Sequence, residues 1–455
     1  MPAYRSVIEM IGNTPLLEVT RFGTGPCRLF LKLENQNPGG SIKDRIGLSM
    51  IEAAERDGNI RSGGTIIEAT AGNTGLGLAL VAAQKGYRML VVVPDKMSQE
   101  KIFHLRAMGA EVMMTRSDVG KGHPEYYQDV AERLSKEMDN AFWVNQFANP
   151  ANPEAHETGT GPEIWDALDN RLDAVVCGVG SGGTLTGLGR FFRRVQPKLE
   201  MVLADPAGSV LADIVNRGEP GELGSWLIEG IGEDFVPPNC DLSLVSKAYV
   251  IPDAESFETA RELLRREGVL AGSSTGTLLA GALRYCREQT EARTVVTFVC
   301  DSGNKYLSKM FNDYWMADQG FVARPARGDL ADLIGRRMED RAVVAVGPED
   351  TLSVAYGRMR LYDVSQLPVL DGERIVGLID ESDLLLALYH HAERFDAPVS
   401  RFMTEKLEVV APDAPLDEVV QVLRADRVAI VVENARFLGL ITKVDLLNYL
   451  RRKAA

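Results

Sequence analysis

Residues 64–94 read GTIIEATAGNTGLGLALVAAQKGYRMLVVVP, and this stretch decides the fold of the first part of the chain. It contains an apolar run at 64–70, a segment of helical character at 74–86 and a second apolar run at 88–94. Continuously apolar runs of this length are typical of strands buried on both faces of a parallel sheet. The stretch therefore predicts two parallel strands with a helix between them, the repeating unit of α/β folds.

The same alternation of strands and helices extends on both sides of this stretch, over about 315 residues in all. A second helix is expected at 98–109. Five further apolar runs predict strands of the same kind, at 28–34, 111–115, 173–179, 200–206 and 294–300. We expect a mostly parallel sheet flanked by helices, with ligand sites in the loops that follow the carboxyl ends of the strands.

Length and charge limit the possible functions. A chain of 455 residues is too long for one ordinary domain and predicts two or three. Its 50 Lys and Arg residues against 64 Asp and Glu residues give a net charge of −14. This balance argues against a nucleic-acid footprint and against a polybasic membrane surface.

The cysteines and the apolar segments bear on location. Five cysteines without a C-x-x-C pair or a zinc spacing predict free thiols in a reducing compartment and no metal site. Residues 1–18 lack the basic and apolar segments of a signal peptide, and no apolar run approaches the length of a membrane span. We therefore expect a cytoplasmic protein with no membrane partner.

Beyond a linker with Gly, Pro and basic residues, the chain repeats itself. The similar segments are VGPEDTL (346–352) with VAPDAPL (410–416), and GLIDESDLL (377–385) with GLITKVDLL (439–447). Two copies of roughly 60 residues each predict a pseudo-symmetric pair of small α/β modules with a cleft between them. The expected boundaries are 1–319 for the first domain, 320–329 for the linker, and 330–392 and 393–455 for the two copies.

Two glycine-rich turns each join a predicted strand to a predicted helix. The first, EATAGNTGLGLA (68–79), offers backbone N–H groups at a helix start, which is a natural carboxylate site. An ordinary tight turn capped by Asn73 is the alternative. The second turn, within CGVGSGGTLTGLGRF (177–191), is suited to wrap a phosphate. The residues that would do so are Gly180, Ser181, Gly182, Gly183 and Thr184.

The second turn also satisfies a dinucleotide-binding pattern. Gly178, Gly180 and Gly183 match G-x-G-x-x-G, and Asp205 ends the next predicted strand, where a ribose-binding acid belongs. Both interpretations place a phosphate at this turn. Phosphate binding is therefore a firmer expectation than the identity of the ligand.

A lysine follows a Gly-Gly-Ser turn in NPGGSIKDR (37–45). Ser41 and Asp44 form a helix start signal, which places Lys43 in the first helical turn, where the helix dipole disfavours positive charge. Either Lys43 is an incidental surface residue or its amine is neutral part of the time.

A hydroxyl-rich turn completes the set of candidate loops. In GVLAGSSTGTLLAGAL (268–283), Ser273, Ser274 and Thr275 precede an apolar helix, where they either serve a ligand or cap the helix. An amine, a phosphate cradle, a carboxylate loop and a hydroxyl suit pyridoxal phosphate with an amino-acid substrate. A helix start in a poorly solvated pocket lowers the pKa of Lys43, which favours the reactive free base.

These motifs resemble a known family. NPGGSIKDR, TAGNTG, GSGGT and GSSTG resemble the four cofactor loops of the fold type II pyridoxal-phosphate enzymes, over residues 1 to about 318. The resemblance implies a catalytic domain of two α/β subdomains, and the repeat resembles a CBS-domain pair. Four stretches resemble the cystathionine β-synthase branch: 94–101, 203–213, 228–238 and 301–316. Residues 146–165 resemble the cysteine synthase branch at least as much.

The resemblance implies roles for individual residues. Lys43 resembles the lysine that forms the imine, Asn73 the residue that binds the ring hydroxyl, and Ser274 the hydroxyl that faces the pyridine nitrogen. Gly180 to Thr184 match the phosphate loop. The substrate-carboxylate region matches Thr70, Ala71, Gly72, Thr74 and Gln146, and Ala71 lacks the hydroxyl that the family often has there.

The implied reaction condenses serine with homocysteine to give cystathionine, and cysteine in place of serine would release hydrogen sulfide. Synthesis of cysteine from O-acetylserine and sulfide is the alternative within the family. The pattern begins within the first dozen residues, without the haem-binding extension of animal relatives, so no haem is expected. Lys96 is a candidate for selecting the second substrate, or an exposed residue at a helix start.

The resemblance to a CBS-domain pair implies one of two roles. Either this part of the chain binds an adenosyl ligand, or it is a scaffold that binds none. The second copy carries Thr442 and Asp445 in the expected register, whereas the first has Asp380 in place of threonine and retains Asp383. A carboxylate at that position repels phosphate.

We expect a homo-oligomer, a dimer or a tetramer. An NAD-type enzyme and a metabolite sensor with an inactive first domain are more distant alternatives, because neither gives Lys43 a role.

Overall fold

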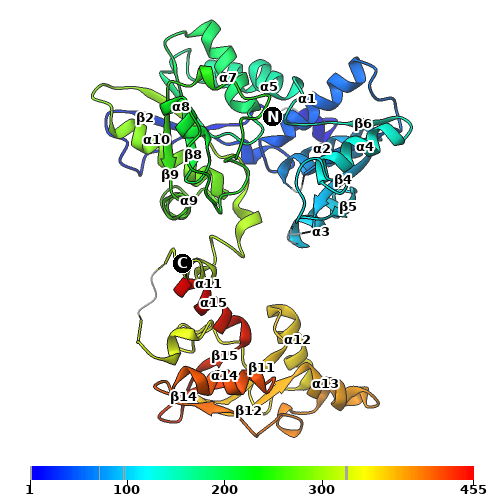
Figure 1. Cartoon of the computed structure of the whole chain (residues 1–455), viewed down its shortest axis with the longest axis vertical. Coiled ribbons are helices and arrows are strands. Elements are labelled where there is room, and N and C mark those ends of the chain that lie inside the picture. Colours follow the sequence, from blue (N-terminus) through cyan, green and yellow to red (C-terminus); the bar gives the residue numbers. More distant parts are fainter. Residues whose placement is uncertain (1–2, 71, 96, 98, 323–325, 455) are drawn as a thin grey trace. The chain divides into compact units, whose positions relative to one another are not determined.

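The computed structural model describes residues 3–70, 72–95, 97, 99–322 and 326–454. The chain forms two compact units, Met1–Phe311 and Asn312–Ala455, which we call the N-terminal and C-terminal units (Figure 1). The CBS copies lie in the second of these. The finer domain boundaries given above stay predictions.

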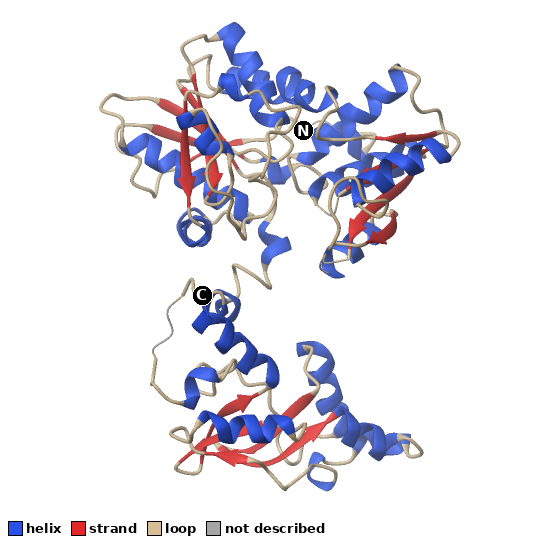
Figure 2. Cartoon of the chain, viewed as in Figure 1, coloured by secondary structure: helices blue, strands red, loops and turns tan. Residues whose placement is uncertain are grey.

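The N-terminal unit contains two sheets, each surrounded by helices (Figure 2). The larger has the order β1-β2-β10-β7-β8-β9 and is parallel except for β1. Its strands are β1 (Leu16–Glu18), β2 (Arg28–Lys32), β7 (Ala174–Cys177), β8 (Glu200–Pro206), β9 (Lys247–Ile251) and β10 (Thr294–Phe298). The smaller, fully parallel sheet has the order β5-β4-β3-β6. Its strands are β3 (Thr65–Ala69), β4 (Arg88–Pro94), β5 (Glu111–Thr115) and β6 (Ala141–Trp143).

All seven predicted strands are confirmed, and so is the α/β class with two subdomains. Three strands of this unit were not predicted: β1 and β6 have only three residues each, and β9 has two exposed residues among its five. The helices of this unit are α1 (Lys43–Arg56), α2 (Asn73–Lys85), α3 (Gln99–Ala107), α4 (Tyr127–Glu137), α5 (Ala151–Ala155), α6 (Gly161–Ala167), α7 (Gly183–Val195), α8 (Leu211–Arg217), α9 (Asp253–Glu267) and α10 (Ser273–Arg287).

Helices α1 and α2 cross in direct backbone contact. A Cβ atom on Gly47 would lie 2.8 Å from the carbonyl carbon of Gly77, and one on Gly77 would lie 2.7 Å from the carbonyl oxygen of Lys43. Both distances are too short for any side chain, so the crossing requires glycine on both helices. This packing holds the first turn of α1 against α2, over an apolar core that includes Met50, Val81 and Val91.

The C-terminal unit contains the two repeated modules, each with its own apolar core. Leu330, Leu333 and Ile334 precede both repeated segments and pack into the core of the second module. The first module consists of α12 (Leu352–Tyr362), β11 (Gln366–Asp371), β12 (Arg374–Asp380) and α13 (Glu381–Leu388). The second consists of β13 (Val409–Val410), α14 (Leu416–Arg424), β14 (Ala429–Glu433), β15 (Arg436–Ile441) and α15 (Lys443–Ala454), and α11 (Asp313–Asp318) precedes both.

Three findings complete the description. The five cysteines are free thiols, as predicted. In the described part of the chain, no group of His, Cys, Asp and Glu side chains has the arrangement of a metal site. No helix within the described ranges is long and apolar enough to cross a bilayer.

Candidate active site

Lys43 is the first residue of α1. The predicted Ser41–Asp44 start signal is wrong in its details, because no side chain caps this helix. Ser41 Oγ accepts a hydrogen bond from the amide of Lys43 (3.2 Å), and Asp44 Oδ2 accepts one from the amide of Gly39 (2.5 Å). The carboxylate of Asp44 therefore stabilises the glycine turn in front of the helix, where Gly40 has a φ of 77°.

One small cavity collects all eight residues predicted to bind the cofactor. We call it the inner cavity. Its lining includes Lys43, Asn73, Gly180, Ser181, Gly182, Gly183, Thr184 and Ser274. These residues come from the starts of four helices, α1, α2, α7 and α10, and from the turns before them. Helix starts converge here because the parallel strands of both sheets deliver their following loops to one edge.

The turn between β7 and α7 has the chemistry of a phosphate site. Gly182 precedes α7 with a φ of 84°, which favours glycine, and the first amides of α7 have no carbonyl partner within the helix. A Cβ atom on Gly180 would lie 2.5 Å from the carbonyl oxygen of Gly230, so this position admits no side chain. Free amides, three hydroxyls (Ser181, Thr184 and Ser274) and Lys43 around one cavity fit pyridoxal phosphate.

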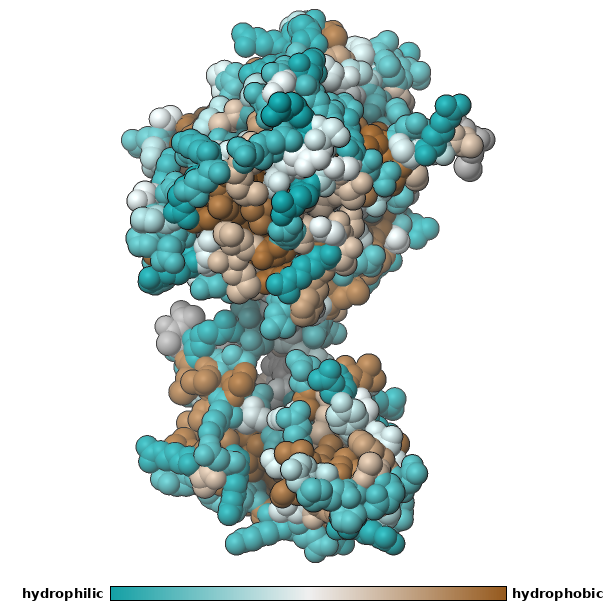
Figure 3. All heavy atoms as spheres, turned by 90° about the vertical axis from the view of Figure 1, so that its right-hand side faces the viewer, coloured by the Kyte–Doolittle hydropathy of each residue, from teal (hydrophilic) through white to brown (hydrophobic). Residues whose placement is uncertain are grey.

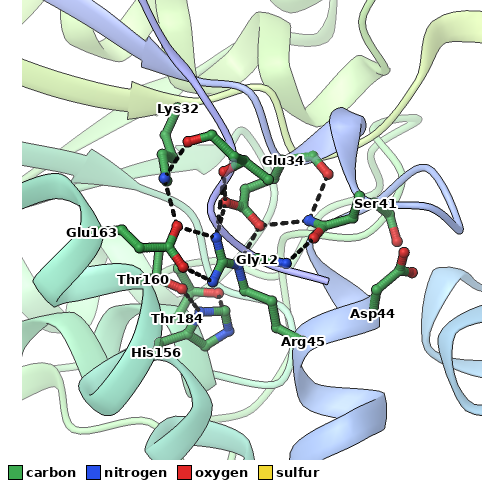
Figure 4. Close-up of polar contacts among 12 residues, drawn as sticks. Gly12, Lys32, Glu34, Ser41, Asp44, Arg45, His156, Thr160, Glu163 and Thr184 are labelled. Carbon is green, nitrogen blue, oxygen red and sulfur yellow. Dashed lines mark hydrogen bonds and ion pairs between the residues drawn. The ribbon is translucent and has the colours of Figure 1, made fainter. Parts of the chain in front are cut away.

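His156 supports the phosphate turn from behind (Figure 4). It begins one turn of π-helix (His156–Thr160), a feature often found at functional sites. Its ring lies between two hydroxyls, with Nδ1 2.9 Å from Thr160 Oγ1 and Nε2 3.2 Å from Thr184 Oγ1. Burial and the charges of Arg45 and Lys43 hold the pKa of His156 well below its usual value. A neutral ring therefore orients the hydroxyl of Thr184.

Asn73 does not cap a helix, so the capped-turn alternative is wrong. Gly72 occupies the cap position of α2. The amide of Asn73 instead donates from Nδ2 to Asp301 Oδ2 (2.8 Å) and accepts at Oδ1 from Lys305 Nζ (2.5 Å). Asp301 Oδ2 also accepts from the hydroxyl of Tyr306. These contacts fix the orientation of the Asn73 amide and leave its second N–H available to a ligand.

The hydroxyls before α10 do not cap it either. Gly272 occupies the cap position without a side-chain hydrogen bond, and α10 begins at Ser273. Ser274 is buried and lines the inner cavity beside Cys300. Burial raises the pKa of the Cys300 thiol to about 12, so the sulfur there is neutral and does not compete with Lys43 as a base.

Asp205 decides against the dinucleotide interpretation. Its carboxylate is fully buried, and Oδ2 accepts a hydrogen bond from the amide of Ala212 (2.9 Å) in the first turn of α8. Burial raises the pKa of Asp205 to about 6. The residue that would bind a ribose is thus committed to the end of a helix and hidden from solvent.

The structure brings together only some of the residues predicted to bind the substrate carboxylate. Thr74 Oγ1 donates to Gln146 Oε1 (2.6 Å), and Thr70 Oγ1 accepts from the amide of Gly72 (3.2 Å). Gly72 lines the larger cavity described below, whereas the other three residues are buried and line neither cavity. Ala71 and Lys96 lie outside the described residues.

Electrostatics favour a reactive amine at Lys43. Burial lowers the pKa of Lys43, and the nearby Cys300, Glu233 and Asp301 oppose this effect. Within the described part of the chain, no residue accepts a hydrogen bond from its Nζ. Lys43 is therefore not a surface residue but an amine that faces a cavity with its charge disfavoured.

A buried ion network lies two residues further along α1 (Figure 4). We define it as Lys32, Glu34, Arg45 and Glu163. Arg45 bonds both carboxylates at distances of 2.7 to 2.8 Å, and Lys32 Nζ lies 2.7 Å from Glu163. Burial opposes ionisation of Glu163, but Arg45 and Lys32 outweigh it and lower the pKa of Glu163 to about 2. The network ties α1 to β2 and to α6.

A second cavity of about 810 Å³ shares lining residues with the inner cavity, and we call it the outer cavity. Asn73, Glu229 and Gly230 line both, so the two cavities adjoin at these residues. The outer cavity is also lined by Lys101, Lys305 and Lys309. A cavity of this size next to the inner cavity suits a small-molecule substrate of the group that reacts at Lys43.

In the C-terminal unit, a cleft of about 610 Å³ is lined by residues of both modules, as the repeat predicted. Thr442 and Asp445 line it, and Thr442 Oγ1 donates to Asp445 Oδ2 (2.6 Å). Asp383 is not among its lining residues. In the first module, Asp380 and Asp383 form a capping box at the start of α13.

Sequence reasoning assigned no role to His156, Asp301, Lys305 or the ion network. The stretch 301–316 was singled out as characteristic, which is a signal for Asp301 and Lys305. Their contact with Asn73 spans more than 200 positions of sequence, however, and periodicity reports only local structure. A π-turn at His156 has no sequence signature.

Comparisons with known proteins agree with this geometry. The family described as pyridoxal-phosphate dependent enzyme matches residues 7–301, and the CBS domain matches residues 336–390 and 399–452. Cystathionine beta-synthase of Dictyostelium discoideum is 35% identical over 98% of this chain and 92% of its own length. That of Saccharomyces cerevisiae is 34% identical over 98% and 97%, and that of Mus musculus is 36% identical over 94% and 77%.

Two solved structures resemble the catalytic part of the chain. A hydrogen sulfide-producing enzyme from Fusobacterium nucleatum has a TM-score of 0.62 and 39% identity, and covers 67% of this chain and 100% of its own. O-ureido-L-serine synthase has a TM-score of 0.63 and 34% identity, and covers 70% and 100%. The chain therefore belongs to the pyridoxal-phosphate-dependent enzyme family and, with its tandem CBS domains, to the cystathionine β-synthase group within that family.

Proposed function

We propose that this pyridoxal-phosphate-dependent enzyme replaces the β-hydroxyl of serine with the sulfur of homocysteine. The Cβ–O bond of serine breaks, a Cβ–S bond forms, and the products are cystathionine and water. The observation that carries the proposal is the convergence of Lys43, the phosphate turn, Asn73 and Ser274 on one cavity that adjoins a larger one. The full-length similarity to cystathionine beta-synthases supports it.

When bound, pyridoxal phosphate supplies an electron sink for the charge that develops at the substrate Cα. Lys43 accepts the Cα proton at Nζ, because burial keeps a fraction of this amine neutral. Ser274 lines the inner cavity and would offer a neutral hydroxyl rather than a carboxylate to the ring nitrogen. A neutral partner does not hold that nitrogen protonated, which suits replacement at Cβ better than transamination.

Other residues of the chain would bind and orient the cofactor and the substrate. The amides of Gly180 to Thr184 hold the phosphate, and the hydroxyl of Thr184 is oriented by His156. The substrate carboxylate would bind at the region of Thr70, Ala71, Gly72, Thr74 and Gln146, of which Gly72 lines the outer cavity.

Parallel assays of the purified holoenzyme test this proposal. One assay supplies serine and homocysteine and measures cystathionine, and the other supplies O-acetylserine and sulfide and measures cysteine. We expect faster turnover in the first. Faster turnover in the second would contradict the proposal and favour cysteine synthase, the second candidate, which the resemblance of residues 146–165 to that branch supports. Cysteine with homocysteine is expected to release hydrogen sulfide.

We further propose that the cleft of the C-terminal unit holds an adenosyl ligand, with Asp445 on the ribose hydroxyls and Thr442 near a phosphate or another polar group. Asp383, held by Asp380, would contribute less. Calorimetry with S-adenosylmethionine and with AMP tests this. Absence of heat with both would leave the pair as a scaffold.

We also propose a homo-oligomer. The C-terminal unit exposes apolar side chains on α13 and α15, and Figure 3 shows apolar patches on one face of this unit. The exposed residues include Leu385, Leu386, Val444, Leu447 and Leu450. Patches of this kind often mark protein–protein contacts. Light scattering on the purified chain would return twice or four times the mass of one chain, and a monomer would contradict the proposal.

A further inference from the structure

The outer cavity is positively charged, although the chain as a whole carries a net charge of −14. Among the described residues of its lining, the three lysines Lys101, Lys305 and Lys309 accompany one carboxylate, Glu229. The fourth basic group is His104, whose pKa is lowered by burial and by the charge of Lys305, so it is neutral near pH 7. A cationic cavity in an acidic protein concentrates anionic ligands.

Two of these lysines are already paired. Lys101 Nζ lies 2.7 Å from Glu229 Oε2, and Lys309 Nζ lies 2.5 Å from Glu229 Oε1. One carboxylate therefore serves two ammonium groups, one at each oxygen. Each of these two cations therefore already has a carboxylate oxygen at hydrogen-bond distance.

Lys305 differs from the other two. Its Nζ donates to Asn73 Oδ1, a neutral acceptor, and within the described part of the chain no carboxylate lies within salt-bridge distance of it. Burial lowers the pKa of Lys305, and the charges of Asp301 and Asp44 oppose this effect, although Asp301 Oδ2 already accepts from Asn73 and Tyr306 and Asp44 Oδ2 from the amide of Gly39. An ammonium group has three N–H donors, so donors of Lys305 remain for a ligand in the cavity.

Lys305 is placed to bind a second substrate that enters the outer cavity. Asn73 lines both cavities, and Lys305 is bonded to it on the outer side. Resting on the proposed function, we propose that Lys305 binds the carboxylate of the second substrate, so that the outer cavity selects an amino-acid thiol over sulfide. The cavity of about 810 Å³ has the size of a small-molecule site, whereas sulfide has no carboxylate for Lys305 to bind.

The test compares two thiols that differ only in the carboxylate: homocysteine and 3-aminopropane-1-thiol. Both react with serine on the full-length holoenzyme, as wild type and as Lys305→Gln, which keeps an N–H donor for Asn73 but removes the charge. We expect KM for homocysteine to rise about 10- to 100-fold, as for loss of a charged hydrogen bond, and KM for 3-aminopropane-1-thiol to change less than about threefold. Lys305→Arg should retain most of the affinity for homocysteine.

Lys309→Met is the matched control. It removes a positive charge from the same cavity, but that charge is paired with Glu229. Its KM for homocysteine should rise less than that of Lys305→Gln. Cofactor content, read from visible absorbance, is measured for every variant because Lys305 also orients Asn73. If Lys305→Gln loses the cofactor, the comparison is made between the two thiols on the wild-type enzyme, where KM for 3-aminopropane-1-thiol should exceed KM for homocysteine about 10- to 100-fold and equal values would overturn the inference.

Equal changes in KM for the two thiols, or no change for either, would overturn the inference while leaving the proposed function intact. A wild-type enzyme that makes cysteine from O-acetylserine and sulfide but no cystathionine would overturn the proposed function as well. The two failures are thus distinguished by the wild-type assay alone.

Discussion

The ion network and the inner cavity each bury a lysine of the N-terminal unit, Lys32 and Lys43. Among the described residues, the first lysine is paired with a carboxylate and the second is not. Burial lowers the pKa of each amine. Lys32 is 1% exposed and is held by the carbonyl of Thr14 (2.6 Å) and by Glu163. Lys43 faces a cavity without such partners. Burial alone thus does not make a lysine reactive; the absence of a carboxylate partner does, because a paired ammonium keeps its proton.

The largest effect is expected when the amine of Lys43 is removed from the inner cavity. Lys43→Ala should reduce turnover about 10³-fold or more, because the base and the attachment point are lost together. The visible absorbance of the bound cofactor should disappear with it. Borohydride reduction of the wild-type holoenzyme, followed by peptide mass spectrometry, should find the cofactor on Lys43 and none on Lys32. Cofactor on the Lys32 peptide would reverse the roles assigned to the two lysines.

Breaking the ion network should affect stability. Glu163→Gln leaves Lys32 and Arg45 underpaired in a buried site, and we expect the free energy of unfolding to fall by about 3–5 kcal/mol in urea titrations. Glu18→Gln is the matched control, because the Arg28–Glu18 pair is exposed at the surface, and it should cost less than about 1 kcal/mol. Similar losses in the two variants would show that the network adds no more than a surface pair.

The same network predicts a pH dependence. The pKa of Glu163 is lowered to about 2 in the folded chain, below its ordinary value, so its stabilisation is present above the unfolded pKa and is lost as pH falls from about 5 to about 2. The difference in unfolding free energy between wild type and Glu163→Gln should shrink by roughly 3 kcal/mol over that range. A difference that stays constant with pH would mean that Glu163 is not ionised in the native network.

The smallest expected effect concerns His156, which lies between the two regions. His156→Phe removes the partner of the Thr184 hydroxyl, and we expect the dissociation constant for pyridoxal phosphate to rise about tenfold, as for one hydrogen bond. The change is measured by titrating the apoenzyme with cofactor and following absorbance. His156→Gln should recover part of the affinity, and His123→Gln, at an exposed site, should change nothing. An unchanged constant in His156→Phe would remove its positioning role.

Much of the fold was predictable from the sequence because the signals are local. A buried parallel strand is continuously apolar, and glycine is favoured where the chain takes a positive φ and required where two backbones touch. These rules located seven strands and the four loops that line the inner cavity. The short strands β1 and β6 escaped because three residues carry no periodicity.

The wrong expectations share a physical cause. Ser41 with Asp44, Asn73, and the serines before α10 all have the composition of helix caps, yet none acts as one. Asn73 and Ser274 find a partner or a cavity made by residues far away in sequence, whereas Ser41 and Asp44 bond amides at the turn before α1. Tertiary contacts thus override a local preference worth about 1 kcal/mol.

The sequence by itself determined the α/β class, the repeated C-terminal modules and the set of loops suited to pyridoxal phosphate, because spacing and residue type express these directly. Only the tertiary structure decided which buried lysine is paired, that Asp205 is committed to a helix, and that Lys305 lines the outer cavity in contact with Asn73. Those outcomes depend on desolvation and on charges brought within a few ångströms from distant parts of the chain. No local pattern contains that information.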